Sequence, residues 1–458
     1  MKHKNIYVIS LIVGMAGFIF VYDSSNLGGS IKYISRFFNV EAAQVGTLVS
    51  VSLLGNFFGS LLSGYFSDKI GRRKTMIYST GVGVLGLLVT ALAPTLISFY
   101  LGRVLFGFSI GLVFVAAPTY ITEIAPASKR GRSGSIRQIC LAFGLILGYI
   151  STFAFNSLFP LEWNIKYGWR LLVSIEVVLL IVILFLFSTL VESPRWLVLK
   201  GKDEEAKKNL SMFLESEERV QLVYSEMLKN NAQSSTGQKV KIRGGLVYAL
   251  GICILFPIFR QLSGVNAVTY YAQKIFADIS NESSNLAYFQ SIFIGVSELL
   301  GAIFVVGFAD KINRKTLLLT GAAGMFFSEG IISYFLYKSV LNIDLSYFVY
   351  IYNFFFTISA GAMLTVYISE VVPTVVRSKG NAISGMVNWL FDAIVIYSFP
   401  LLNANVYLTE KFHGSFPFIV FSSFMLMFFI VVLFLPETRN KTLEEIADYW
   451  KTKGDWTK

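Results

Sequence analysis

The sequence Gly64-Tyr-Phe-Ser-Asp-Lys-Ile-Gly-Arg-Arg-Lys74 recurs in the second half of the chain as Gly307-Phe-Ala-Asp-Lys-Ile-Asn-Arg-Lys315. Each copy follows a long apolar segment and places an acidic residue just before a group of basic ones. Two further matches have nearly the same offset: Tyr120, Glu123, Pro126 and Arg130 pair with Tyr367, Glu370, Pro373 and Arg377, and Glu192-Ser-Pro-Arg195 pairs with Glu437-Thr-Arg439. Three matches in the same order predict a chain built from two copies of one unit.

Long apolar runs place both units in a membrane. The chain has 458 residues, of which 54% are hydrophobic and only 15% charged, whereas a soluble domain carries roughly 25% charged residues. Runs such as Leu171–Leu190 and Phe416–Leu435 reach the roughly 20 residues that a helix needs to cross the hydrocarbon core. Such unbroken runs exclude a barrel of alternating strands, which are only about ten residues long.

Each unit supplies six predicted membrane-spanning helices. They lie near 6–34, 43–66, 75–93, 96–119, 133–156, 169–191, 245–277, 286–308, 316–337, 345–369, 380–402 and 413–435. The polar stretch between the units predicts a cytoplasmic linker with amphipathic helices. The predicted domains are therefore residues 1–195, the linker 196–243, residues 244–437 and a tail, 438–458. A parallel repeat of six spans is typical of transporters with a site between the halves.

The distribution of charge indicates the topology. Most of the 39 lysines and arginines fall in the loops and tails on the side of both termini, so the positive-inside rule predicts cytoplasmic termini in a plasma or inner membrane. The +11 net charge is spread over alternate loops, which argues against a nucleic-acid partner. The chain offers no nucleophile–base set or phosphate loop, so we expect neither an enzyme nor a cofactor, and no obligate protein partner is evident.

Several motifs, taken in order, resemble the sugar porter family of the major facilitator superfamily, and the resemblance covers essentially the whole chain. They are Tyr22-Asp23, the segment from Pro118 to Gly131, Glu192-Ser-Pro-Arg-Trp-Leu197, the segment from Gln261 to Tyr271, and Pro436-Glu-Thr-Arg-Asn-Lys-Thr-Leu-Glu-Glu-Ile446. The resemblance implies an all-α membrane protein of two pseudo-symmetric six-helix bundles with cytoplasmic linker helices. It also implies transport of a monosaccharide by alternating access.

Asp23 lies well inside the first apolar run. An acid at this depth costs roughly 2.5–3.5 kcal/mol on insertion scales and is usually functional or paired. Arg103, in the fourth span, is the natural partner, either as a static ion pair or as part of a proton switch. An aspartate here resembles proton symporters of the family, whereas facilitative carriers have asparagine, so a proton is the predicted coupling ion.

A sugar site should be rich in amides, because a neutral amide both donates and accepts hydrogen bonds. By resemblance, the expected sugar-contacting or adjacent residues are Gln138, Gln261, Asn266, Asn388 and Trp389, with Tyr270 and Tyr271 closing the outer side. Each amide could instead serve only as a helix–helix hydrogen bond.

The second half departs from the family pattern where the substrate should bind. Arg260 replaces the first of two glutamines, Glu298 stands where asparagine is common, and Thr365 stands where tryptophan is usual. We expect Arg260 and Glu298 to form an ion pair, either purely structural or in contact with a neutral sugar; alternatively, Arg260 binds the carboxylate of a sugar acid. Ala362 replaces a proline, which raises the question of how easily the tenth span bends.

The repeated charges at the membrane edge are the predicted cytoplasmic gate. The set comprises Asp68, Arg72, Arg73, Glu123, Arg130, Glu192, Arg195, Asp310, Arg314, Glu370 and Arg377. The alternative is solvated flanking charge, worth about 0–1 kcal/mol per exposed pair. The leading hypothesis is proton symport of a hexose or pentose. A transporter of a sugar acid or polyol, a facilitative carrier and, least of all, a sugar sensor are the alternatives.

Overall fold

The structure is a computed structural model that describes residues 5–41, 44–125, 130–214, 216–234, 244–280, 284–308, 311–339, 344–372, 374–439, 446, 449–450 and 452. Within these ranges all regular secondary structure is helical, and twelve helical segments are long and apolar enough to cross a membrane. The predicted fold class is thus confirmed, and the chain is a multi-pass membrane protein.

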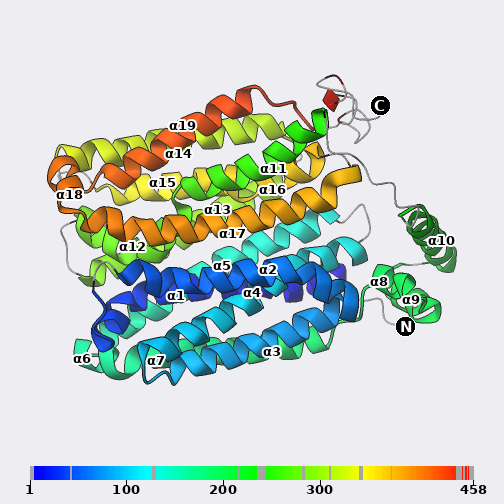
Figure 1. The fold of residues 1–458 in the computed structure, drawn as a ribbon, viewed down its shortest axis with the longest axis horizontal. Helices are drawn as coiled ribbons and strands as arrows, with labels where there is room; N and C mark the ends of the chain where they lie inside the picture. The colour runs from blue at the N-terminus through cyan, green and yellow to red at the C-terminus, as the bar shows by residue number, and fades with distance from the viewer. Residues whose placement is uncertain are drawn as a thin grey trace.

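The first six spans form one bundle, the N-half, in which each helix runs antiparallel to the next (Figure 1). Five spans are single helices: α1 (Ile6–Phe37), α2 (Val45–Ile70), α3 (Arg72–Ala91), α4 (Leu96–Ile124) and α5 (Arg130–Leu158). The sixth consists of α6 (Leu161–Trp163), the π-helical turn η3 (Asn164–Gly168) and α7 (Trp169–Ser188).

Three short helices follow and lie beyond one end of the bundles (Figure 1). They are α8 (Pro194–Leu199), α9 (Asp203–Leu210) and α10 (Glu217–Ser234). We call this end of the molecule the linker face and the opposite end the far face. The predicted division into domains remains a prediction, and α8 runs across its first boundary.

The other six spans form the C-half. They comprise α11 (Gly245–Leu262) with α12 (Val265–Ser280), α13 (Ser284–Phe308), α14 (Arg314–Tyr337), α15 (Ser346–Phe356) with the π-helical turn η4 (Thr357–Gly361) and α16 (Met363–Val371), α17 (Thr374–Ala404), and α19 (Phe416–Leu433). The short α18 (Val406–Phe412) precedes α19 at the far face. The halves meet where α1 packs on α12, α2 on α17 and α5 on α13.

Three spans are interrupted, and each interruption has a local cause. In the sixth span, the π-helical turn begins at Asn164, whose side chain donates to the carbonyls of Phe155 (2.9 Å) and Phe159 (3.2 Å) near the end of α5. Between α11 and α12, Gly264 adopts φ +76°, a conformation that suits glycine. In the tenth span, the π-helical turn η4 widens the helix just before Ala362, so the helix is irregular there without the proline.

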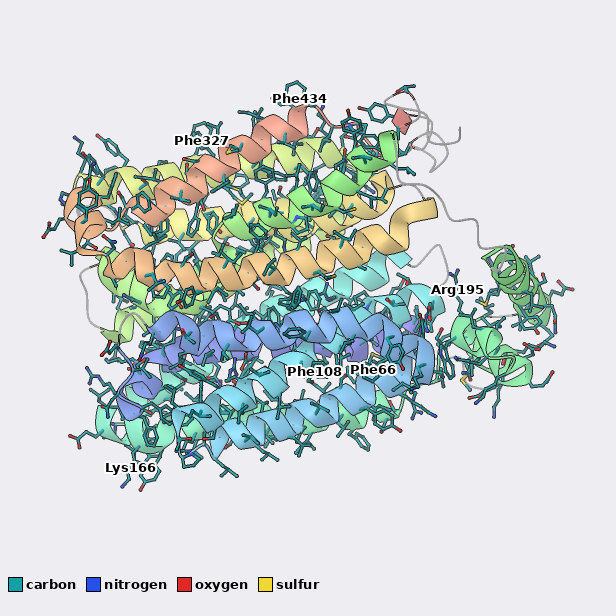
Figure 2. The ribbon with its side chains drawn as sticks, viewed as in Figure 1. Phe66, Phe108, Lys166, Arg195, Phe327 and Phe434 are labelled. Atoms are coloured by element: carbon teal, nitrogen blue, oxygen red, sulfur yellow. The ribbon has the colours of Figure 1, made fainter. Side chains whose placement is uncertain are left out.

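Large apolar side chains cover the flanks of the bundles, as lipid contact requires. Figure 2 shows Phe327 and Phe434 projecting outward from the C-half, where they are 63% and 78% exposed. The labelled charged residues Lys166 and Arg195 lie instead at the two ends of the molecule.

The two halves are closely joined at the far face. A Cβ atom at Gly46 would lie 2.5 Å from the carbonyl oxygen of Tyr397, and one at Gly28 would overlap the carbonyl of Tyr270. Hydrogen bonds across the same interface run from Tyr288 to the Gly29 carbonyl (2.7 Å), from Tyr149 to the Thr269 carbonyl (2.8 Å) and from Asn156 to Asn285 (2.5 Å). At the linker face, no hydrogen bond or ion pair joins the halves among the residues that the structure describes. The structure is therefore closed at the far face.

This packing leads to a first prediction. Gly46→Val should separate α2 from α17 and shift the conformational equilibrium toward opening of the far face, because small residues permit such close helix contacts. Spin labels at Lys166 and Lys338, on the far-face ends of the two halves, should report a longer distance, by several ångströms. The matched control is Gly81→Val, since no atom lies within 4 Å of a Cβ there. Equal distance distributions in both variants would contradict the prediction.

Candidate transport site

A cavity of about 340 Å³ lies between the halves. Helices α1, α4 and α5 line it from the N-half, and α11, α12, α13, α15, η4, α16 and α17 line it from the C-half. The lining includes seven residues predicted from the sequence: Gln138, Arg260, Gln261, Asn266, Glu298, Asn388 and Trp389. On α4 and α17 it extends to Pro118 and Asn381, toward the ends of these helices at the linker face.

Amide side chains connect three helices of the C-half around this cavity. The Oδ1 atom of Asn388 accepts hydrogen bonds from Arg260 (2.9 Å) and Gln261 (3.0 Å). Asn266 donates to the Oε1 atom of Gln261 (3.1 Å) and to Asp392 (2.8 Å). The turn at Gly264 brings α12 back beside the end of α11, which is why Asn266 can reach Gln261. The network holds these groups in place while they face the cavity.

The predicted ion pair between Arg260 and Glu298 is wrong for this conformation. Arg260 donates to Asn388 instead, and no ion pair between Arg260 and Glu298 is formed, although both side chains are described. The reason is the position of α17, which places Asn388 within direct reach of the guanidinium. Glu298 and Asp392 are close enough to act on Arg260 only through the electrostatic field.

Trp389 is a packed side chain rather than a free platform for a sugar ring. It is 1% exposed, and its indole makes edge contacts with Phe20 (5.3 Å between centroids) and Phe114 (4.9 Å), both from the N-half. The three rings therefore join the halves beside the cavity. Thr365 belongs to α16, and its side chain lies outside the described residues.

Tyr270 and Tyr271 do not line this cavity; they line a second hollow on its far-face side. The hydroxyls of Tyr270 and Ser24 lie 3.0 Å apart, which connects α12 with α1. Tyr271 donates to the carbonyl of Ile396 (3.2 Å) and stacks on Phe399. Both tyrosines are buried.

Arg137 was missed by the sequence analysis. It lines the cavity from α5, directly before Gln138, and its guanidinium lies 4.3 Å from the ring centroid of Phe114. An ionisable residue inside a predicted span is the signal that could have revealed it; its nearness to the basic loop before α5 obscured this signal.

Asp23 and Arg103 form a buried ion pair next to the cavity. The guanidinium contacts both carboxylate oxygens, at 2.5 Å and 2.8 Å, and the side chains are 4% and 1% exposed. Glu176 on α7, also missed by the sequence analysis, lies beside Asp23 and accepts a hydrogen bond from Asn26. The signal for Glu176 was again an acid within a long apolar run. The cluster thus contains two carboxyl groups and one cation.

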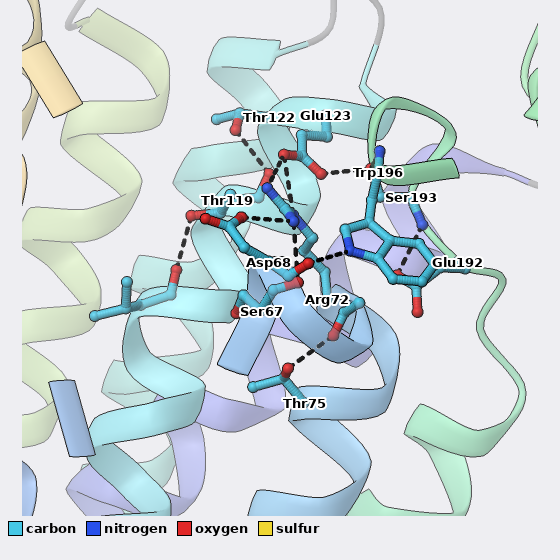
Figure 3. Close-up of polar contacts among 12 residues, drawn as sticks. Ser67, Asp68, Arg72, Thr75, Thr119, Thr122, Glu123, Glu192, Ser193 and Trp196 are labelled. Atoms are coloured by element: carbon cyan, nitrogen blue, oxygen red, sulfur yellow. Dashed lines mark hydrogen bonds and ion pairs between the residues drawn. The ribbon is translucent and has the colours of Figure 1, made fainter. Parts of the chain in front are cut away.

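Charged residues at the linker face form a cluster within each half. In the N-half, Arg72 contacts Asp68 (3.0 Å) and Glu123 (3.1 Å), while Trp196 of α8 donates to the Asp68 carbonyl (Figure 3). Ser193 donates to Glu123 as well. In the C-half, Arg314 lies 3.7 Å from Glu370.

Two glutamates related by the repeat bind the starts of equivalent helices. Glu192 accepts from the backbone N–H of Arg73 (3.0 Å) at the start of α3, and Glu437 accepts from Arg314 and Lys315 (both 3.0 Å) at the start of α14. A carboxylate is favourable there, because a helix N-terminus carries positive partial charge. Arg195 lies on α8 and is exposed. Asp310 and the side chains of Arg130 and Arg377 lie outside the described residues.

Comparison with known proteins identifies the family. The family model "Sugar (and other) transporter" matches residues 5–450. The chain belongs to this family. It is 29% identical to the D-xylose-proton symporter of Escherichia coli K12, covering 97% of this chain and 96% of the relative. It is 30% identical to the glucose transporter GlcP of Staphylococcus epidermidis, covering 96% of each chain.

A solved structure has the same fold. The proton:xylose symporter XylE bound to 6-bromo-6-deoxy-D-glucose matches with a TM-score of 0.84 and 27% identity, covering 97% of this chain and 99% of that chain. The predicted family is therefore confirmed, and the family consists of transporters rather than enzymes.

The Asp23–Arg103 pair leads to a second prediction. Arg103→Gln should destabilise the fold by about 3–5 kcal/mol, because breaking a buried pair leaves a charge uncompensated. Adding Asp23→Asn should recover most of the loss. Thermal unfolding of purified protein measures both, with Arg219→Gln on exposed α10 as the control. If the double variant does not unfold at a higher temperature than Arg103→Gln, the ion pair does not account for this stability.

Proposed function

We propose that the protein carries a monosaccharide across the membrane together with a proton, by alternating access. The observation that carries this proposal is the buried cluster of Asp23, Arg103 and Glu176 next to a cavity lined with amides. The relatives support both parts, since one is a xylose–proton symporter and another a glucose transporter.

The cavity suits a small solute with many hydroxyl groups. Amides supply donors and acceptors without net charge, and aromatic rings such as Phe20 and Phe356 supply apolar contact. Gln138 approaches from the N-half, and Gln261, Asn266 and Asn388 from the C-half. A solute held by both halves would stabilise the conformations in which they approach each other.

Asp23 and Glu176 together hold the coupling proton. If both carboxyl groups were ionised, Arg103 could compensate only one of them, and the other would be a buried charge costing several kcal/mol. One bound proton removes this cost. Proton release toward one side and uptake from the other then require that the cluster become accessible in turn to each side.

A direct chain of contacts links this cluster to the cavity. Asp23 is followed by Ser24, whose hydroxyl contacts that of Tyr270, and Tyr270 lines the hollow on the far-face side of the cavity. Neutralising Asp23 weakens its ion pair with Arg103, which frees α1 to move against α4. The contact between Ser24 and Tyr270 is then lost, and the far face can open.

The linker face is the cytoplasmic side, because most of the basic loops lie there. The clusters around Arg72 with Glu123 and Arg314 with Glu370 are the cytoplasmic gate. In the described state, closed at the far face, each cluster is satisfied within its own half. When the linker face closes, the clusters meet and their charges bridge the halves, with Arg130, Arg195 and Arg377 as further partners.

An uncoupled, facilitative carrier is the second candidate function, since transport of a sugar down its gradient requires a binding cavity but no proton site. The presence of a buried acid pair beside the cavity favours coupling, because such a cluster is costly to maintain without a function.

Asp23→Asn tests the proposal. In proteoliposomes with an inward-directed pH gradient, the unmodified protein should accumulate a labelled monosaccharide, up to roughly tenfold per pH unit for one proton. The variant should reach only the external concentration while still exchanging labelled for unlabelled sugar. Glu226→Gln, on exposed α10, is the control. Unchanged accumulation in Asp23→Asn would exclude the assigned proton site.

A further inference from the structure

The central cavity contains a cation, Arg137, for which the described part of the chain supplies no hydrogen-bond acceptor. Among the described residues, Arg137 makes no hydrogen bond and no ion pair, and its guanidinium contacts only the ring of Phe114 there. The charged side chain that acts on it is Arg260, which has the same sign. A guanidinium offers five N–H donors in a planar fork. The contact with the Phe114 ring uses none of these donors, so a ligand in the cavity is the natural source of an acceptor for them.

Carboxyl groups occupy the other side of the same cavity. Glu298 on α13 accepts no hydrogen bond from a described residue, and the Oδ2 atom of Asp392 on α17 has no partner either. Both are contributed by the C-half, whereas Arg137 is contributed by the N-half. The N-half side of the cavity therefore presents a cation, whereas the C-half side presents carboxyl acceptors beside Arg260, whose guanidinium already donates to Asn388.

A second hollow, at the far face, repeats the positive charge. This vestibule has a volume of about 340 Å³ and is lined by Tyr270 and Tyr271, which do not line the central cavity. Lys32 and Lys274 line it, together with Gln273, which is 7% exposed and whose amide nitrogen and oxygen both lack partners. A solute entering from the far face meets two lysines before it reaches the two arginines. Clefts lined by one sign of charge raise the local concentration of the opposite one.

We propose that the transported monosaccharide is a sugar acid, whose carboxylate binds Arg137 and whose hydroxyls donate to Glu298 and Asp392. The inference rests on the proposed function and names the substrate class of the same site. A planar carboxylate matches the guanidinium fork in a bidentate manner. Hydroxyl groups in turn form strong, charge-assisted hydrogen bonds to carboxylates. A neutral sugar would offer Arg137 only hydroxyl oxygens, without a compensating charge or the bidentate geometry of a carboxylate.

The substrate charge has a consequence for the driving force. A sugar acid carries one negative charge, and the coupling proton carries one positive charge, so the pair moves no net charge. A membrane potential should then have no effect on accumulation, and only the pH gradient should drive it. For a neutral sugar with one proton, a potential of 100 mV would give roughly fifty-fold accumulation.

The test uses the full-length protein in proteoliposomes and matched pairs of labelled probes: galacturonate with galactose, and gluconate with glucose. Uptake is measured under a pH gradient alone and under a potassium diffusion potential alone. We expect the acids to be transported with at least tenfold higher kcat/KM than their neutral partners, and to respond to the pH gradient only.

Variants assign the preference to Arg137. Arg137→Gln should reduce the preference for the acid at least tenfold, while Arg137→Lys, which keeps the charge but loses the fork, should retain an intermediate preference. Arg219→Gln on α10 is the matched control. Lys32→Gln with Lys274→Gln should raise the KM of the acid at low salt, and Lys411→Gln, on far-face α18 outside the vestibule, should not. Elution as a single species by gel filtration checks folding.

The outcomes separate the two proposals. Neutral sugars transported as well as the acids would overturn the sugar-acid inference and leave proton-coupled transport standing. A preference for acids that survives in Arg137→Gln would overturn the role of Arg137. Uptake of neither class under either gradient would overturn the proposed function, and the inference with it.

Discussion

The structure depends on one buried ion pair, between Asp23 on α1 and Arg103 on α4. Neither charge could remain in an apolar bundle alone, because an uncompensated ion there costs several kcal/mol. Their contact therefore fixes how α1 lies against α4, and Glu176 on α7 adds a third helix to the same cluster. Since Ser24 connects α1 to Tyr270 of the other half, the position of this pair also determines how the halves meet.

The two halves share a fold but divide the chemistry between them. The N-half contains the acidic pair with its arginine, and the C-half contains the linked amides Gln261, Asn266 and Asn388. Interruptions in two helices of the C-half position residues at the cavity. The turn at Gly264 brings Asn266 next to Gln261, and the π-helical turn η4 lets Gly361 line the cavity. The two halves remain similar at Glu192 and Glu437, each of which accepts hydrogen bonds from backbone N–H groups at the start of a helix.

The cavity has an unusual electrostatic character for a site that binds a polyhydroxylated solute. Amides alone would suffice to bind hydroxyl groups. Arg137 of the N-half faces Arg260, Glu298 and Asp392 of the C-half, and this arrangement imposes an orientation on any ligand that carries charge. The position of Arg260 illustrates how such a site is balanced, because Asn388 accepts its hydrogen bond while the carboxylates remain available to a ligand.

Much of the fold could be read from the sequence because hydrophobic length and internal repetition are local properties. Apolar runs such as Leu171–Leu190 need no partner to be recognised, and the repeat around Asp68 and Asp310 indicates two related bundles. Asp23 could be matched with Arg103 since two opposite charges within the membrane require each other. The amides at the cavity could be named only by resemblance to a family.

Only the tertiary structure decided which charges meet in the cavity. The sequence suggested Arg260 with Glu298, but hydrogen bonding depends on the rotation of each helix about its axis, and α17 places Asn388 in that position. For the same reason, the sequence could not assign a partner to Arg137 or Glu176, as a single ionisable residue near a loop or in a long span does not reveal which way it faces. Helix length and the positions of charged residues follow from the local sequence. The partner of each side chain depends instead on the packing of segments that are far apart in the sequence.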